Sequence, residues 1–204
     1  MSGRKFVQAV SGSIVALTRD LAKLHDIEAK LATLRARDPD FRLFCARAHR
    51  YQLGPVLKED QLSGLEQEFG ATLPDGYRTF LLHIGNGGAG PYYGLFPLAG
   101  GDPEDLTDFN SIKDPFPWKD KNLRPRRVLP GALYICNYGC ALRFVLIVTG
   151  QCRGEVWHDW RADSAGIYPA TNPRGDRLHF LEWYSQWLDD RLTNPVDVSP
   201  PGLR

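Results

Sequence analysis

The sequence predicts an α+β fold, a single domain in which an antiparallel β-sheet meander is packed by helices at both termini, plus a long-helix extension at the N-terminus. Three observations lead to this prediction. Residues 132–136 and 142–148 are rich in β-branched and aromatic side chains, as neighbouring strands are. Amphipathic helical patterns lie on either side of these runs, at 62–84 and 176–192. A longer helical pattern covers residues 13–37.

The N-terminal pattern predicts one long amphipathic helix from Ser13 to Arg37. Its apolar seam consists of Ile14, Leu17, Leu21, Leu24, Ile27, Leu31 and Leu34. Ser11 or Ser13 can cap its start, and Asp38-Pro39 ends it. The seam resembles a heptad pattern for about three repeats, which is shorter than an autonomous coiled coil requires. The helix therefore either lies on the domain's own core or pairs with another chain, including a second copy in a homodimer.

Local signals agree best in the segment that follows. Apolar residues at helical spacing end at Gly70, which suits the left-handed residue that closes a helix. Pro74 holds the residue before it extended, so a second short helix begins after it. Asn86-Gly87-Gly88 supplies residues that tolerate a positive φ for a tight reversal. Residues 91–96 then predict the start of a first strand.

This segment carries a composite pattern of a Leu-Glu pair, a glycine, Leu-Pro, a tyrosine, Phe-Leu and Asn-Gly-Gly. The residues are Leu65, Glu66, Gly70, Leu73, Pro74, Tyr77, Phe80, Leu81, Asn86, Gly87 and Gly88. In this pattern the chain resembles the SUKH superfamily, which includes the fungal Smi/Knr cell-wall synthesis regulators and many bacterial immunity proteins. The resemblance implies one domain at residues 55–192, with a helical extension at 1–54 and a tail at 193–204.

The strand signals further along the chain predict an antiparallel meander. The run at 142–148 is apolar nearly throughout, so it should be a central strand covered on both faces. A turn at 137–140 separates it from the run at 132–136, and a further turn leads to a third strand at 155–160. A loop that holds residues 168–169 precedes the final helix, whose wide apolar stripe covers the core.

Composition and charge exclude several classes of function. With 204 residues, 43% of them apolar and 24% charged, the chain is ordinary for a globular protein. The formal net charge of +1 argues against direct nucleic-acid binding, which usually needs a marked basic excess. No apolar run approaches the roughly twenty residues that span a bilayer, and the N-terminus lacks the apolar stretch of a secretory signal. We therefore expect a cytoplasmic protein without a membrane partner.

Four cysteines allow a metal or disulfide interpretation. Cys136, Cys140 and Cys152 could act with His158 as zinc ligands, but their spacing is not that of a zinc knuckle. Free cysteines, Cys45 included, are among the most buried residue types, so we favour small buried hydrophobic side chains. A reducing compartment disfavours disulfides. We expect no metal and no other cofactor.

No set of residues predicts catalysis. The sequence lacks a nucleophile elbow, a His-Glu-x-x-His pair and a phosphate-binding loop with its lysine. His158 is the best candidate for a general base, because carboxylates lie near it in the sequence. Asp159, however, is adjacent on a strand and points to the other face. A hydrolase or a zinc protein is therefore the weakest of three functional alternatives, and we expect no catalytic residue.

The resemblance implies a binding function. A bacterial immunity protein binds a cognate toxin and blocks it, whereas the fungal relatives resemble regulatory scaffolds. Both roles need a complementary surface and neither needs a catalytic residue. An immunity protein with a toxin as its partner is the first hypothesis, and a regulatory or scaffold interaction module is the second.

Exposed aromatic and charged side chains are what a recognition surface needs, so they mark the candidate partner-binding residues. These are Tyr92 and Tyr93; Asp102, Glu104, Asp105 and Asp108 in an acidic loop; Trp118 in a proline-rich loop; and Trp157, Asp159 and Trp160. The acidic loop could contact a basic partner, and residues 119–127 offer the opposite charge. Each of these groups can instead serve only the fold.

Overall fold

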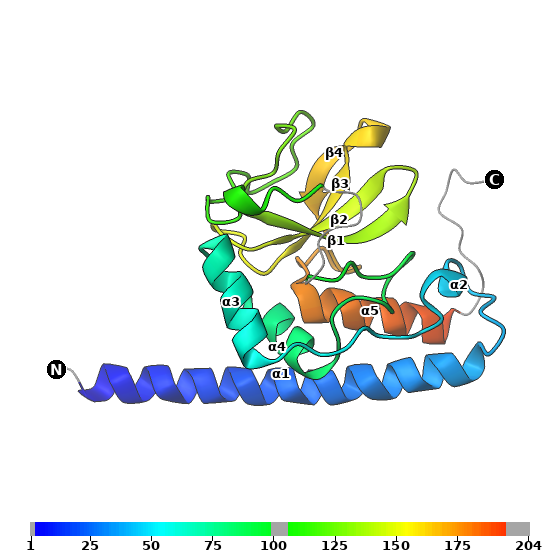
Figure 1. The fold of residues 1–204 in the computed structure, drawn as a ribbon, viewed down its shortest axis with the longest axis horizontal. Coiled ribbons are helices and arrows are strands. Elements are labelled where there is room, and N and C mark those ends of the chain that lie inside the picture. Colours follow the sequence, from blue (N-terminus) through cyan, green and yellow to red (C-terminus); the bar gives the residue numbers. More distant parts are fainter. Residues whose placement is uncertain (1–2, 99–105, 195–204) are drawn as a thin grey trace.

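The computed structural model describes residues 3–98 and 106–194. Within these residues the chain forms five α-helices and one four-stranded antiparallel sheet, which confirms the α+β prediction (Figure 1). The helices are α1 (Gly3–Arg37), α2 (Ala46–His49), α3 (Glu59–Phe69), α4 (Asp75–His83) and α5 (Phe180–Thr193). The strands are β1 (Ala132–Gly139), β2 (Leu142–Ile147), β3 (Val156–Trp160) and β4 (Gly166–Pro169). The sheet order β1-β2-β3-β4 follows the chain, so the sheet is a meander.

The sheet contains a strand, β4, that the sequence does not predict. β4 pairs antiparallel with β3, with Trp160 opposite Gly166 and His158 opposite Tyr168. We expected a loop here, because four residues that end in Pro169 carry little strand signal. The proline is tolerated because β4 is an edge strand and ends at this residue. As a result β3 has a neighbouring strand on both sides.

The predicted first strand at 91–96 is not formed. Leu95 makes only single-residue bridges, one of them to β1. Tyr92 has a φ of 53°, a left-handed conformation that is incompatible with a strand. Phe96 donates a backbone hydrogen bond to the carbonyl oxygen of Ile135 at 2.9 Å. The segment is thus an irregular connection attached to β1.

The pair of helices α3 and α4 forms as the sequence predicts, and Glu66 explains how they are joined. Gly70 has a φ of 65° and closes α3 as its left-handed C-cap. The Glu66 carboxylate is buried and accepts a hydrogen bond from the backbone N–H of Leu73 at 2.8 Å. The side chain of Arg78 in α4 donates to the same carboxylate at 3.2 Å. The glutamate of the Leu-Glu pair therefore ties the end of α3 to α4.

α1 begins earlier than predicted and lies on the domain's own core over residues 20–37. It starts at Gly3, so the serines that we expected as caps lie inside the helix. Its buried seam residues are Leu24, Ile27, Leu31 and Leu34. Lys30 forms an ion pair with Asp189 of α5, with 2.7 Å between Nζ and Oδ1. Figure 1 shows α1 running beneath α4 and α5, with its N-terminal end extending past them.

Apolar side chains cover both faces of the sheet, as predicted for a central β2. One face packs against the helices in a large cluster that includes Leu133, Phe144, Leu146, Phe80 and Tyr184. The other face is closed by residues 106–131, which we call the covering loop. Its smaller cluster includes Phe116, Leu129, Val145, Ile147 and Trp157.

Candidate partner-binding surface

Tyr92 and Tyr93 lie on an irregular turn and face different ways. Tyr93 is 49% exposed, and its ring meets that of Phe44 edge to face at 6.4 Å between centroids. Tyr92 is half-buried and lies 4.1 Å from Tyr138, measured between ring centroids. Tyr93 therefore reaches solvent while Tyr92 anchors the turn.

Most of the predicted acidic loop falls outside the part of the chain that the structure describes. Asp102, Glu104 and Asp105 are in this undescribed part. Asp108 is half-buried, and its carboxylate accepts a hydrogen bond from the backbone N–H of Asn110 at 3.1 Å. It thereby caps the short 3-10 helix at Phe109–Ser111, so the described end of the loop has a role in the fold.

Trp157 is buried, so the prediction of an exposed patch there needs correction. Its exposed fraction is 0%, and Phe116 of the covering loop meets it edge to face at 4.9 Å between centroids. Trp118 is half-buried and packs against the same phenylalanine at 5.2 Å. The strand alternation places Trp157 on the face that the covering loop closes. Its indole therefore holds this loop on the sheet.

Asp159 is also buried, with an exposed fraction of 5%, so the prediction that it lies on the surface needs correction. The Tyr134 hydroxyl donates to its carboxylate at 2.7 Å, and Arg161 donates through Nε at 2.7 Å and through Nη2 at 2.6 Å. Arg161 Nη1 donates in turn to the backbone carbonyls of Arg126 and Arg127, at 2.7 and 2.8 Å. Hydrogen bonding to Asp159 raises the pKa of Arg161, so the guanidinium stays charged. This Tyr134–Asp159–Arg161 network holds the covering loop against the sheet.

His158 lies on the opposite face of β3 from Asp159, as the strand alternation predicts. Its ring stacks on Tyr168 at 4.6 Å and lies 4.7 Å from Phe144, both measured between centroids. Burial lowers the pKa of His158 to about 4, so the ring is neutral near pH 7. Its Nδ1 is buried and has no hydrogen-bond partner among the described residues. His158 is half-buried, and its ring contacts with Tyr168 and Phe144 give it a packing role.

Two predicted groups that are far apart in the sequence meet in space. Tyr138 contacts Tyr92 at 4.1 Å and Trp160 at 5.2 Å between ring centroids. The indole Nε1 of Trp160 is buried and has no hydrogen-bond partner in the described part of the chain. We call the connected rings the aromatic cluster; they are Tyr92, Tyr138, Phe144, His158, Trp160, Tyr168 and Trp183.

A pocket of about 180 Å³ opens beside the aromatic cluster, between the sheet and α5. Its aromatic lining consists of Tyr92, Phe144, His158, Trp183 and Trp187. Asp190 and Arg191, near the C-terminal end of α5, also line it. Burial raises the pKa of the Asp190 carboxyl group. Because pockets for drug-sized ligands occupy about 300–1,000 Å³, this one suits a single amino-acid side chain.

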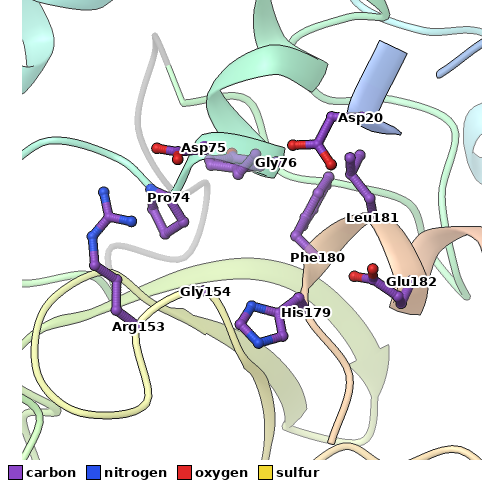
Figure 2. Close-up of a pocket in the computed structure, with 11 residues that line it drawn as sticks. Asp20, Pro74, Asp75, Gly76, Arg153, Gly154, His179, Phe180, Leu181 and Glu182 are labelled. Atoms are coloured by element: carbon purple, nitrogen blue, oxygen red, sulfur yellow. The ribbon is translucent and has the colours of Figure 1, made fainter. Parts of the chain in front are cut away.

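A larger pocket, of about 430 Å³, lies where the first turns of α4 and α5 approach the turn between β2 and β3 (Figure 2). Asp75 and Glu182, from the first turns of these two helices, both line it. Glu182 forms an ion pair with Lys23 of α1. Arg153, from the turn, donates hydrogen bonds to backbone carbonyls just ahead of α4. Since carboxylates at helix N-termini offset the helix dipole, these charges serve the fold.

The cysteines differ in burial. Cys136 and Cys152 are buried, as expected for small hydrophobic side chains, whereas Cys140 is exposed in the turn between β1 and β2. Among the residues that the structure describes, no group of three or more His, Cys, Asp or Glu side chains could hold a metal ion. No helix in the described ranges is long and apolar enough to cross a membrane.

Comparison with known proteins gives one match. A model of the SMI1/KNR4 family (SUKH-1) matches residues 57–173. This range is more than half of the 204 residues and contains α3, α4 and all four described strands. Neither the curated proteins nor the solved structures contain a significant match to the chain.

Proposed function

Because the chain belongs to the SMI1/KNR4 family (SUKH-1), as its sequence resemblance suggested, we propose that it is a non-enzymatic protein-binding domain. Within that role it is a cytoplasmic immunity protein that binds a cognate bacterial toxin and neutralises it. The observation that carries this proposal is an exposed aromatic side chain, Tyr93, supported by a cluster of packed rings.

The geometry around Tyr93 has the properties of an interface anchor. Rigid aromatic rings bury a large area at a small cost in conformational entropy, and tyrosine is enriched among the residues that dominate binding energy. Its neighbour Tyr92 is fixed by Tyr138 and Phe144, at 4.1 and 5.8 Å between ring centroids. The small aromatic pocket beside Tyr92 offers a place for one side chain of the partner. A partner would therefore meet a pre-organised surface.

The test is affinity purification of the tagged protein from its own cells at moderate salt, followed by quantitative mass spectrometry. We expect one partner at a near-equal amount, and that partner should carry a separate toxic domain. A Tyr93→Ala variant should recover at least about tenfold less of it, which corresponds to about 1.4 kcal/mol. Val56→Ala is the matched control, since Val56 is similarly exposed at 48% but lies elsewhere.

The outcomes separate the proposals. Loss of the toxin with Tyr93→Ala but not with Val56→Ala supports the immunity role and this surface. Many partners at low amounts would contradict the immunity role and favour the scaffold. An enzymatic activity that disappears in a His158→Ala variant would contradict the non-enzymatic assignment.

A regulatory or scaffold module that forms a homodimer through the N-terminal helix is the second candidate. It is favoured by one observation: the N-terminal end of α1 extends beyond the rest of the fold (Figure 1). Light scattering of the full chain and of a chain without residues 3–19 tests it. A mass of two chains that falls to one on truncation would support the dimer, and a monomer in both cases would contradict it.

A further inference from the structure

Residues 119–128 of the covering loop, which we call the basic loop, carry a net positive charge. Its five cations, Lys119, Lys121, Arg124, Arg126 and Arg127, are all exposed. None of these five side chains makes an ion pair or a hydrogen bond within residues 3–98 and 106–194. The single carboxylate of the loop, Asp120, pairs with Arg177 at 2.7 Å. Lys121 lies 5.3 Å from the centroid of the Tyr168 ring.

Apolar side chains are exposed among these cations. Leu123 is 62% exposed and Val128 is 44% exposed. A groove of about 800 Å³ adjoins the basic loop and is lined by Leu106, Arg127 and Val128, among others. Exposed apolar groups with charged surroundings are typical of protein-interaction sites. The basic loop therefore combines steering charges with an apolar contact.

Internal contacts fix the shape of the basic loop without using its cationic side chains. Arg161 donates to the carbonyls of Arg126 and Arg127, as described above. Asn122 and Ile167 exchange two backbone hydrogen bonds, at 2.9 and 2.8 Å. A loop that is already ordered loses little conformational entropy when it binds. The cations and Leu123 are thus presented to solvent on a fixed backbone.

We propose that the basic loop and the adjoining groove form a docking surface for an acidic protein partner, with Leu123 as the apolar contact. The inference rests on the proposed protein-binding function and names the chemistry of the partner. A protein fits better than a nucleic acid, because the net charge of the whole chain is only +1 and the centre of the surface is apolar. If the partner is a toxin, the toxin surface that the basic loop contacts is acidic. The cleft of a nuclease is instead basic, so the contacted surface is not such a cleft.

The first test uses a displayed library of random short peptides and the full chain. The loop variant is the triple substitution Lys121→Glu, Arg124→Glu and Arg126→Glu. The matched control reverses three exposed cations elsewhere, Arg35→Glu, Arg47→Glu and Arg50→Glu, and so has the same net charge. We expect the recovered peptides to be acidic and to contain a large apolar residue. Their affinity should fall at least about tenfold for the loop variant and stay within about twofold for the control.

Two further measurements complete the test. Affinity should decrease with rising salt, because exposed charges are screened over about 10 Å at 0.1 M salt. Leu123→Ser should weaken binding while leaving this salt dependence unchanged. If the charge-reversed loop variant fails to fold, as judged by near-ultraviolet circular dichroism, the alanine triple at the same three positions takes its place.

Three results would overturn the proposal. The first is a set of recovered peptides without an acidic bias. The second is an equal loss of peptide affinity in the loop variant and the control. The third is tighter binding of duplex DNA or anionic vesicles than of any peptide. The peptide selection does not need the natural partner. Failure to find a toxin in cells would therefore contradict the immunity role but not the docking surface. A toxin that binds only through Tyr93 would support the immunity role and contradict the docking surface.

Discussion

The two faces of the sheet are closed in different ways, although the same four strands contribute to both. Helices cover one face, and apolar side chains such as Phe80 and Tyr184 fill the space between them and the strands. The covering loop closes the other face, where fewer apolar side chains are buried. There the Tyr134–Asp159–Arg161 network and backbone hydrogen bonds hold the loop. The helical face buries the larger apolar cluster, whereas the loop face combines a smaller apolar cluster with a polar network.

This difference determines where the molecule can carry function. A packed helical face tolerates little change, since a lost methylene leaves a cavity. A loop held by a small apolar cluster and by polar contacts to its backbone leaves its outward side chains free for recognition. The following substitutions test this division, from the largest expected effect on stability to the smallest.

Phe80→Ala should be the most destabilising change. Phe80 has 0% exposure and lies 4.9 Å from Tyr184 and 5.2 Å from Phe180 between ring centroids. Removing a buried phenylalanine ring costs about 3–5 kcal/mol. Urea unfolding followed by circular dichroism measures the free energy of unfolding, and a loss below about 1 kcal/mol would contradict the importance of packed volume on this face.

Asp159→Ala should cost less, about 2 kcal/mol, and should loosen only the loop face. The substitution leaves the half-buried Arg161 guanidinium without its carboxylate and so weakens the hold on Arg126 and Arg127. Hydrogen exchange should become faster at amides of residues 119–128 and stay slow in α5. Asp163→Ala is the control, since Asp163 is exposed. Equal acceleration on both faces would show that the two faces are not independent.

His158 should make stability depend on pH in an acidic window. Burial lowers the pKa of His158 in the folded protein to about 4, whereas an unfolded histidine has a pKa of about 6.5. Below pH 6.5 the unfolded state binds a proton that the folded state excludes. The contribution of His158 to stability is therefore fully present above about pH 6.5 and is lost as the pH falls from about 6.5 to 4. His49, whose pKa burial also lowers to about 4, contributes in the same direction.

The variant His158→Phe tests this assignment. It should reduce the pH dependence of the unfolding free energy between pH 6.5 and 4 and leave the part due to His49. Unfolding in urea at a series of pH values measures both. An unchanged slope would mean that burial does not lower the pKa of His158 in the folded protein.

Tyr93→Ala should have the smallest effect on stability, within about 0.5 kcal/mol, because its side chain is largely exposed. The same change is expected to have a large effect on partner binding. Urea unfolding and the affinity purification described above compare the two effects directly. A loss of stability of several kcal/mol would place Tyr93 in the fold and remove it as an interface anchor.

The helical part of the fold could be predicted because its signals are local. Gly70 and Pro74 act on the residues beside them, so the boundaries of α3 and α4 follow from short-range rules. β4 was missed because its four residues include Pro169, and its pairing with β3 depends on contacts across a turn. The irregular segment at 91–96 has a strand-like composition, but the left-handed Tyr92 prevents regular pairing.

The candidate site was harder to predict, because exposure is a property of the assembled molecule. Alternation in β3 correctly separates His158 from Asp159 but does not show that a loop covers the face of Trp157. The burial of Asp159 depends on Tyr134, which is 25 residues away in the sequence, and on Arg161 beyond the end of β3. The sequence shows the basic residues of the covering loop only as a charge opposite to the acidic loop; that they form no ion pair with another described residue is visible only in three dimensions. The contact between Tyr138, Tyr92 and Trp160 likewise joins three separate segments.

The hold of Arg161 on the basic loop has one more consequence. Its two acceptors are main-chain carbonyls, which every amino acid at positions 126 and 127 would provide. Mutations in this loop can therefore replace the side chains shown to solvent while its course stays the same. Evolution could change the partner of such a protein by substitutions in the loop alone, at little risk to folding.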